Sequence, residues 1–141
     1  KANPTPDLGD SPYPQNNRFA QSLESAIKIL KYNSDTKVVT MAGSSGLGGW
    51  DDHSNATDYV ERMRLLFQSL KAGVAHLKAE GKINDVTIMV FGEFGRGVNL
   101  NGSHGWDHGN LQNLYILGGK NYLNHQGVIG ETKVHHTGRV N

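Results

Sequence analysis

The 141-residue chain contains no cysteine. This absence excludes disulfide frameworks, zinc–thiolate sites and thiol nucleophiles. Long hydrophobic runs are also missing, because no apolar stretch approaches the roughly 18 residues that a membrane-spanning helix needs. We therefore expect no membrane span.

The chain also lacks an excess of either positive or negative charge. Lysine and arginine total 14 against 13 for aspartate and glutamate, the net charge is +1, and no basic run exceeds two residues. This balance argues against electrostatic binding of nucleic acid. The hydrophobic content of 36% is low but compatible with one globular domain and a modest core. Histidine, in contrast, occurs seven times, and it is the common metal ligand and proton carrier near neutral pH.

All four prolines lie within residues 1–16, among aspartate, serine and asparagine. Because proline fixes φ and removes a backbone donor, we expect this stretch to be an extended linker or a surface segment. Regular patterns begin after it, so we assign residues 17–141 to one domain. Residues 119–141 are rich in glycine, asparagine and histidine, and at most a short hairpin is expected there.

Two stretches carry the apolar spacing of a helix. In residues 17–33, apolar side chains recur at steps of three and four, which predicts an amphipathic helix. A longer apolar stripe runs through residues 59–77, and it places Arg62 and Arg64 on the opposite face. Gly81 is well placed to end this second helix.

Three short apolar runs predict strands: residues 37–42 (K-V-V-T-M-A), 86–91 (V-T-I-M-V-F) and 114–117 (L-Y-I-L). The run at 86–91 is of the kind that is buried on both faces. Because a long strand–helix–strand connection joins parallel strands, we predict an α/β fold, with a mostly parallel sheet flanked by helices. Ligands of such folds bind beyond the carboxyl ends of the strands.

Asp51 and His53 follow a glycine-rich loop just past the first predicted strand. A carboxylate oxygen and an imidazole nitrogen are both good ligands for zinc or manganese, so this pair can converge on one ion. The alternative is purely structural, since an aspartate also favours the positive end of the helix that follows.

A second pair, Asp107 and His108, lies between Gly105 and Gly109. The two glycines allow the backbone to approach a metal or a ligand closely, although an ordinary turn explains the tripeptide Asp-His-Gly as well. Two such pairs at strand edges together favour a metal site more than either does alone.

Glu93 and Arg96 directly follow the predicted strand 86–91. Glu93 can act as a metal ligand or a general base, and Arg96 can bind an oxyanion through its guanidinium fork. A buried salt bridge between the two explains the pattern equally well. His135 and His136 near the end of the chain are better explained as part of a solvated tail.

Four motifs in this order resemble the DUF1501 family: G-G-W-D-D-H at 48–53, V-T-I-M-V-F-G-E-F-G-R at 86–96, N-G-S-H-G-W-D-H-G at 101–109 and Y-I-L-G-G at 115–119. The family pattern is G-G-W-D-T-H, then S-E-F-G-R, then N-G-S-x-G-x-D-H-G. The resemblance covers roughly residues 37–130. It places the chain in a branch of the alkaline phosphatase-like superfamily, which includes sulfatase-like enzymes.

The resemblance implies an α/β/α sandwich with metals at the carboxyl ends of sheet strands. By analogy, Asp51, His53 and His108 would form one metal site. A second metal usually takes an Asp-His pair where this chain has Glu93 and Phe94; Phe94 cannot ligate a metal, whereas Glu93 still can.

Hydrolases of the superfamily carry a nucleophile at the end of their first strand, and nothing before residue 37 resembles that strand. We therefore expect a carboxyl-terminal portion of a longer protein, whose amino-terminal part is a partner of this one. The family resemblance also implies export to the periplasm or secretion.

Two functions are compatible with these residues. The first is a metal-dependent hydrolase of phosphate or sulfate esters, acting on a small-molecule or glycan ester, with Arg96 and Glu93 as catalytic residues. The second is a non-catalytic module that binds a metal or an anion on a degenerate hydrolase scaffold. Phe94 in a ligand position is the best sequence support for the second, whereas the resemblance as a whole favours the first.

Overall fold

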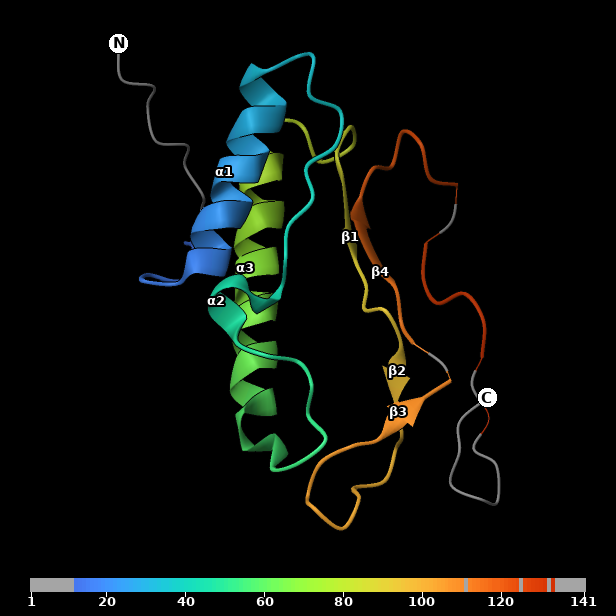
Figure 1. Cartoon of the computed structure of the whole chain (residues 1–141). Coiled ribbons are helices and arrows are strands. Elements are labelled where there is room, and N and C mark those ends of the chain that lie inside the picture. Colours follow the sequence, from blue (N-terminus) through green and yellow to red (C-terminus); the bar gives the residue numbers. More distant parts are fainter. Residues whose placement is uncertain (1–11, 111, 125, 132, 134–141) are drawn as a thin grey trace.

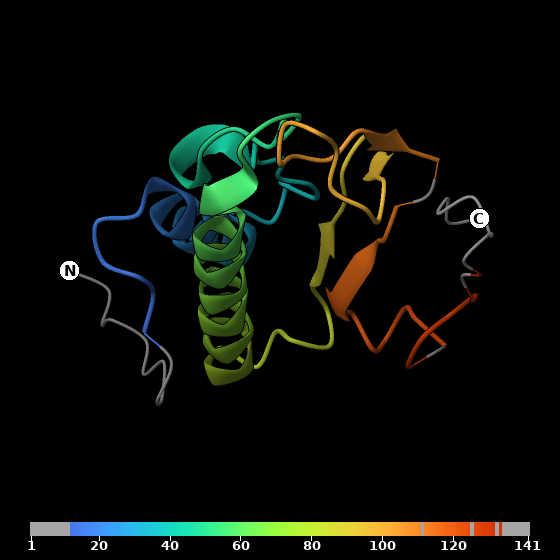
Figure 2. The ribbon, with the colours of Figure 1, turned by 90° about the horizontal axis from the view of Figure 1, so that it is seen from below.

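The computed structural model describes residues 12–110, 112–124, 126–131 and 133. Helices form one layer and strands lie beside them as a second layer (Figures 1 and 2). The elements in chain order are α1 (Arg18–Tyr32), α2 (Ser44–Leu47), the 3-10 turn η1 (Ala56–Asp58), α3 (Tyr59–Ala79), β1 (Thr87–Val90), β2 (Gly95–Arg96), β3 (His108–Gly109) and β4 (Tyr115–Gly118).

Helix α1 forms where the apolar spacing predicted it. Asn17 is its N-cap, and the Asn17 Oδ1 accepts a hydrogen bond of 3.0 Å from the backbone N–H of Ala20. The amide nitrogen of the same side chain donates to the carbonyl of Gly46, also at 3.0 Å. One buried asparagine therefore both starts α1 and fixes the short turn α2 against it.

The hydrophobic core lies between α1 and α3, which run side by side (Figure 1). Leu77 of α3 is almost fully buried, and Leu23 and Ile27 of α1 pack close to Gly73 of α3. A Cβ atom at Gly73 would stand 3.0 Å from a methyl group of Leu23, so glycine permits the close approach of the helices. Gly81, with φ of 65°, follows the C-cap of α3 as predicted.

The strands belong to one long hairpin with two ladders. β1 pairs antiparallel with β4, from Thr87 opposite Gly118 to Val90 opposite Tyr115. β2 pairs antiparallel with β3, with Arg96 opposite His108. Four residues (91–94) separate the ladders on one side and five (110–114) on the other, so one side carries an extra residue. The hairpin turns back through residues 97–107, which form its tip.

The predicted α/β fold is wrong, because the described residues form neither a mostly parallel sheet nor the α/β/α sandwich that the resemblance implied. The strands near 86–91 and 114–117 exist, but they pair with each other and antiparallel, in two-stranded sheets. Residues 37–42 form no strand, so α3 connects no parallel pair and the βαβ unit that the prediction required is missing from the described residues. The apolar pattern predicts which segments are extended. An extended segment becomes a strand only if another segment pairs with it through backbone hydrogen bonds.

The predicted burial of 86–91 on both faces is also wrong. Ile88 and Val90 pack against the helices, with Leu117 beside them. Met89 and Ile116 lie opposite each other on the other face, and their side chains are 55% and 42% exposed. One face of the sheet thus packs against the hydrophobic core, and the Phe67 ring of α3 lies edge-on to the Tyr115 ring of β4.

Two further expectations concern the ends of the chain. Residues 1–11 lie outside the described part, as do His135 and His136. No strand occurs in those residues between 119 and 133 that the structure describes. Within the same described ranges, no helix combines the length and apolar character that crossing a membrane requires.

A polar contact is buried beside the core. The Tyr13 hydroxyl lies 3.0 Å from Nδ1 of His76, and both side chains are buried. Glu80, which is ion-paired with Lys31, lies 4.0 Å from the other ring nitrogen of His76. Burial lowers the pKa of His76, although the negative charge of Glu80 partly opposes the shift. Burial raises the pKa of Tyr13.

The lowered pKa of His76 predicts a loss of stability in acid. Its pKa is about 6.5 in the unfolded chain and lower in the folded one. The unfolded state therefore binds more protons below about pH 6.5. The free energy of unfolding is highest above that pH and falls as the pH drops through the folded pKa. We expect the melting temperature to fall more steeply with decreasing pH in the wild type than in His76→Gln, which has no imidazole to protonate. Thermal melts of both proteins over a range of pH provide the measurement. Parallel slopes for the two proteins would contradict the assignment to His76.

Candidate metal centre

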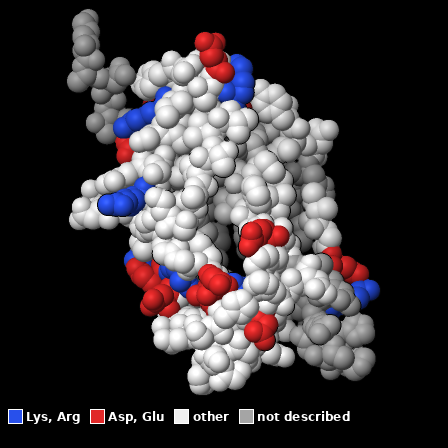
Figure 3. Space-filling model, viewed as in Figure 1, with Lys and Arg blue, Asp and Glu red and all other residues white. Residues whose placement is uncertain are grey.

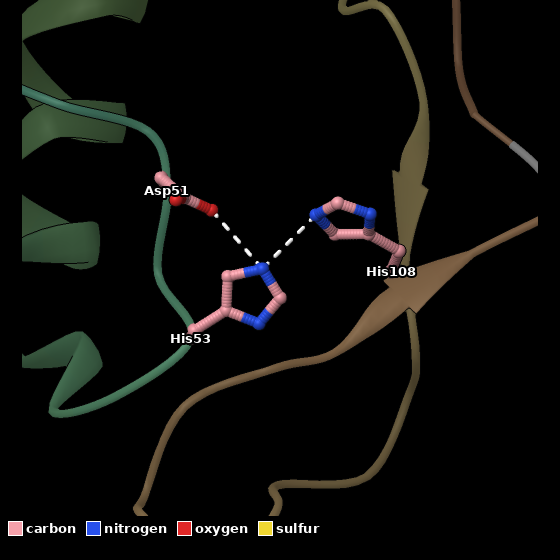
Figure 4. A group of neighbouring side chains, drawn as sticks. All are labelled: Asp51, His53 and His108. Carbon is pink, nitrogen blue, oxygen red and sulfur yellow. Dashed lines mark hydrogen bonds and ion pairs between the residues drawn. The ribbon is translucent and has the colours of Figure 1, made fainter.

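The first half of the site is the loop between α2 and η1. Its side chains alternate, as in an extended chain whose successive residues point to opposite sides. Asp52 is buried and forms an ion pair with Arg62 of α3, and the side chains of the two residues are only 11% and 12% exposed. Asp51 and His53, on either side of Asp52, are exposed and face the hairpin (Figure 4).

Arg62 holds this loop at three points. One nitrogen of its guanidinium donates to the Asp52 carboxylate, and another donates to the carbonyl of Gly49. Its guanidinium carbon lies 5.4 Å from the centre of the Trp50 ring, within the range of a cation–π contact. The position and the outward orientation of Asp51 and His53 thus depend on a side chain of the long helix.

The second half of the site is the tip of the hairpin, which crosses the first loop. The backbone N–H of Trp106 donates to the carbonyl of Asp52 at 2.7 Å, and Ser54 forms an antiparallel bridge with His104. The crossing requires a glycine, because a Cβ atom at Gly105 would overlap the backbone of Asp52 and His53.

Arg96 of β2 also ties the two halves together. Its Nη1 donates to the carbonyl of Trp106 at 2.9 Å, and its Nη2 donates to the carbonyl of Trp50 at 3.0 Å and to Oδ1 of Asp51 at 2.8 Å. The alternative of a Glu93–Arg96 salt bridge is not what forms, since Arg96 pairs with Asp51. The hydrogen bond from Arg96 lowers the pKa of Asp51, so this carboxylate is ionised at neutral pH.

Where the halves meet, three side chains converge (Figure 4). Nε2 of His53 lies 3.0 Å from Nε2 of His108 and 3.2 Å from Oδ1 of Asp51. The donor atoms of the three residues all lie within 4.8 Å of one another. Two imidazole nitrogens and a carboxylate oxygen suit a divalent ion such as zinc, so the residues present fit a metal site.

The surroundings of the three ligands are acidic and aromatic. Figure 3 shows that the charged surface at the loop end of this face is mainly acidic, which favours a cation there. The ring of Phe94 lies 3.9 Å from that of His108, centre to centre. On the helix side, the Tyr59 ring packs edge-on against Trp50 and Trp106. These rings restrict how the two loops can move relative to each other.

The structure brings together three of the five ligands predicted from the sequence. Asp107 does not face the point where the three donor atoms meet. Its Oδ1 lies 3.6 Å from Nδ1 of His53, whereas the donor atom of His53 is the other ring nitrogen, Nε2. Glu93 is exposed on the hairpin. Among the described residues, the group able to hold a metal comprises Asp51, His53 and His108, and includes neither Asp107 nor Glu93.

Two residues that organise the site were missed in the sequence. Arg62 was placed on the solvent face of its helix, yet its side chain is buried against Asp52. Asn101 was not singled out, although its amide joins both halves: Nδ2 donates to the carbonyl of His53 and to Asp107, and Oδ1 accepts from the N–H groups of Ser103 and Gly105. The sequence Asn-Gly-Ser signals a turn centred on Asn101, but not its partners.

Removing Arg62 should destabilise the protein strongly. We expect Arg62→Met to lower the free energy of unfolding by about 3–5 kcal/mol, because it leaves the Asp52 charge buried without a partner. Adding Asp52→Asn should recover part of this loss. Arg64→Met is the matched control, since Arg64 pairs with Glu61 on the exposed surface, where solvent screens the ion pair, and its loss should change stability far less. Urea denaturation measures all four proteins, and equal losses for the two arginine variants would refute a special role for Arg62.

The crossing of the loops can be tested by adding one methyl group. Gly105→Ala should cost about 1–3 kcal/mol, as overpacking does, because the hairpin tip must move away from Asp52 and His53. Gly102→Ala, in the same tip, meets no atom within 4 Å and should change stability by less than about 0.5 kcal/mol. Denaturation curves and amide chemical shifts of residues 52–56 provide the measurement. A neutral Gly105→Ala would mean that the close approach is not required.

Comparison with known proteins gives one match. The model of the family described as "Protein of unknown function (DUF1501)" matches residues 9–138, nearly the whole chain. No curated protein and no solved structure matches. The family match agrees with the four sequence motifs, and it includes all three residues of the metal centre. The chain belongs to the DUF1501 family.

Proposed function

We propose that this chain holds one divalent metal ion, zinc or manganese, through Asp51, His53 and His108. The observation that carries the proposal is the convergence of their three donor atoms, which lie within 4.8 Å of one another. Asp51 and His53 come from the loop that Arg62 holds, and His108 comes from β3, whose ladder partner Arg96 donates to that loop, so the group is formed before any ion arrives. Because all three side chains are exposed, an ion held there would be open to a substrate.

The activity that this site supports best is metal-dependent hydrolysis of phosphate or sulfate esters, of a small molecule or a glycan. Its support is the resemblance of the four motifs to the DUF1501 family, which we infer to be a branch of the alkaline phosphatase-like superfamily, combined with an exposed two-histidine, one-carboxylate group. A bound divalent ion supplies Lewis-acid polarisation of an ester oxygen. The same resemblance supports a periplasmic or secreted location.

Neighbouring residues would hold the three ligand side chains in position and orient them. Arg96 keeps Asp51 ionised and aimed at the histidines, through the hydrogen bond to Oδ1. The stacked ring of Phe94 restrains that of His108. Roles for Arg96 in neutralising an oxyanion, and for Glu93 as a base or ligand, stay predictions from the sequence.

A second candidate is a module that binds a metal or an anion without turning over a substrate. It is favoured by the position of Phe94, an apolar ring against His108 where the superfamily usually carries a second metal ligand. It is also favoured by Arg96, whose two terminal nitrogens already donate three hydrogen bonds within the protein.

Metal binding is tested directly by titrating the metal-free chain with zinc or manganese in a calorimeter. We expect one ion per chain for the wild type and none for the double variant His53→Ala/His108→Ala. His104→Asn is the matched control, because His104 lies in the same hairpin tip with φ of 59°, which asparagine tolerates. It should bind like the wild type. An absence of binding by the wild type would overturn the metal site.

Activity is tested on an aryl phosphate and an aryl sulfate with metal supplied. Because nothing before residue 37 resembles the strand that carries the nucleophile in superfamily hydrolases, we expect turnover by this chain alone to be weak or absent. Any release of the alcohol should disappear in His53→Ala/His108→Ala and persist in His104→Asn, and such metal-dependent release would favour the hydrolase over the binding module. Turnover that survives in the double variant would contradict the hydrolase proposal.

A further inference from the structure

Asn101 and Gly102, in the tip of the hairpin, form the one Asn-Gly dipeptide of the chain. The backbone nitrogen that follows an asparagine can attack the carbonyl carbon of its side chain, and a glycine leaves this approach open because it has no Cβ. The N–H of Gly102 donates no hydrogen bond within the described ranges, and a Cβ atom added to Gly102 would meet no atom within 4 Å. The attacking nitrogen is therefore neither engaged nor crowded.

The reaction needs no reagent except water. A bond forms between the nitrogen of Gly102 and Cγ of Asn101, the bond between Cγ and Nδ2 breaks, and Nδ2 leaves as ammonia with the proton of the attacking nitrogen. The product is a cyclic imide. Water then adds to one of its two carbonyl carbons and opens the ring, which gives aspartate or isoaspartate. Either product carries a negative charge where the amide was neutral, and isoaspartate also lengthens the backbone by one carbon.

In the folded chain the Asn101 side chain is held by both halves of the site. Its Nδ2 donates to the carbonyl of His53 at 2.9 Å and to Oδ1 of Asp107 at 3.0 Å. Its Oδ1 accepts from the backbone N–H groups of Ser103 and Gly105, at 3.0 and 3.1 Å. A side chain fixed at four points cannot turn freely to bring Cγ onto the neighbouring nitrogen. Cyclisation therefore needs the tip to lift from the loop that carries His53.

We propose that Asn101 is a site of spontaneous deamidation, which is protected while the hairpin tip rests on the loop of His53 and becomes reactive when the tip lifts. In the product, an oxygen takes the place of Nδ2 and faces the carbonyl of His53 and the carboxylate of Asp107. All of these oxygens only accept hydrogen bonds, and the two carboxylates repel each other. The modification therefore prevents the tip from closing again, and no bound metal ion is required for it.

Deamidation is followed by incubating the protein at physiological temperature and mapping its peptides by mass spectrometry. We expect Asn101 of the folded wild type to react roughly tenfold or more slowly than in the urea-unfolded chain, because the reaction waits for local opening. Gly102→Ala should slow the reaction even in the unfolded chain, since its methyl group hinders the attacking nitrogen. Equal rates in the folded and unfolded wild type would overturn the proposal, as would an Asn101 that stays unmodified in the unfolded chain.

The role of the loop crossing is tested with Gly105→Ala, which pushes the tip away from the first loop. Hydrogen exchange at the N–H of Trp106, which donates to the carbonyl of Asp52 across the loops, measures how often the tip lifts. We expect deamidation of Asn101 and this exchange to rise by the same factor in Gly105→Ala. Asn33, which precedes a serine at the end of α1, is the internal control and should react at the wild-type rate. Faster exchange without faster deamidation would refute the gating by the crossing.

Asn101→Asp carries the product of the reaction from the start. We expect the N–H of Trp106 to exchange about tenfold or more faster in this variant than in the wild type, because acceptors without a donor keep the loops apart. Asn99→Asp is the matched control, since it adds the same charge at an exposed position of the tip and should exchange like the wild type. Exchange in Asn101→Asp at the wild-type rate would show that the modified tip still closes, against the proposal.

Discussion

The ion pair between Asp52 and Arg62 is the contact on which the candidate site depends. It is formed at the boundary between the helices and the loops, where both side chains are shielded from water. A charge buried in this way needs its partner, so the position of Asp52 is fixed to the first turns of α3. Because side chains alternate along this loop, burying Asp52 turns Asp51 and His53 outward. The long helix thereby determines where two of the three candidate ligands lie.

The hairpin brings the third ligand by a different means. Its tip lies directly on the backbone of the first loop at Gly105, and Arg96 joins the loops by donating to carbonyl groups from both. These contacts are made to backbone groups of the loops, and they need a glycine at 105 and the guanidinium of Arg96, whereas the metal-binding group needs two imidazoles and a carboxylate at fixed distances. This division of roles explains how a small chain with few strands can hold three exposed ligand side chains together.

How much could be predicted from the sequence differs between local and distant features. The apolar spacing of α1 and α3 is a local property, and both helices formed where it indicated. Strand pairing is not local: residues 37–42 carry the same β-branched signal as β1, yet Val38 is 80% exposed and only β1 found a partner. For the same reason Arg62 looked like a solvent-facing residue of an amphipathic helix. The grouping of Asp51, His53 and His108 came from the family resemblance. The orientation of the His53 ring relative to Asp107 could be known only from the structure.

The candidate ligands are divided between the two layers of the molecule. Asp51 and His53 belong to the loop that is fastened to α3, and His108 belongs to the hairpin. A two-stranded ribbon has little stability of its own, so the hairpin is the part of the described chain expected to open first in local unfolding. An ion held by all three residues would join the layers and would have to dissociate before the hairpin could leave the helices. Occupancy of the site and the protection of β1 and β4 amides from hydrogen exchange are then two measures of one equilibrium.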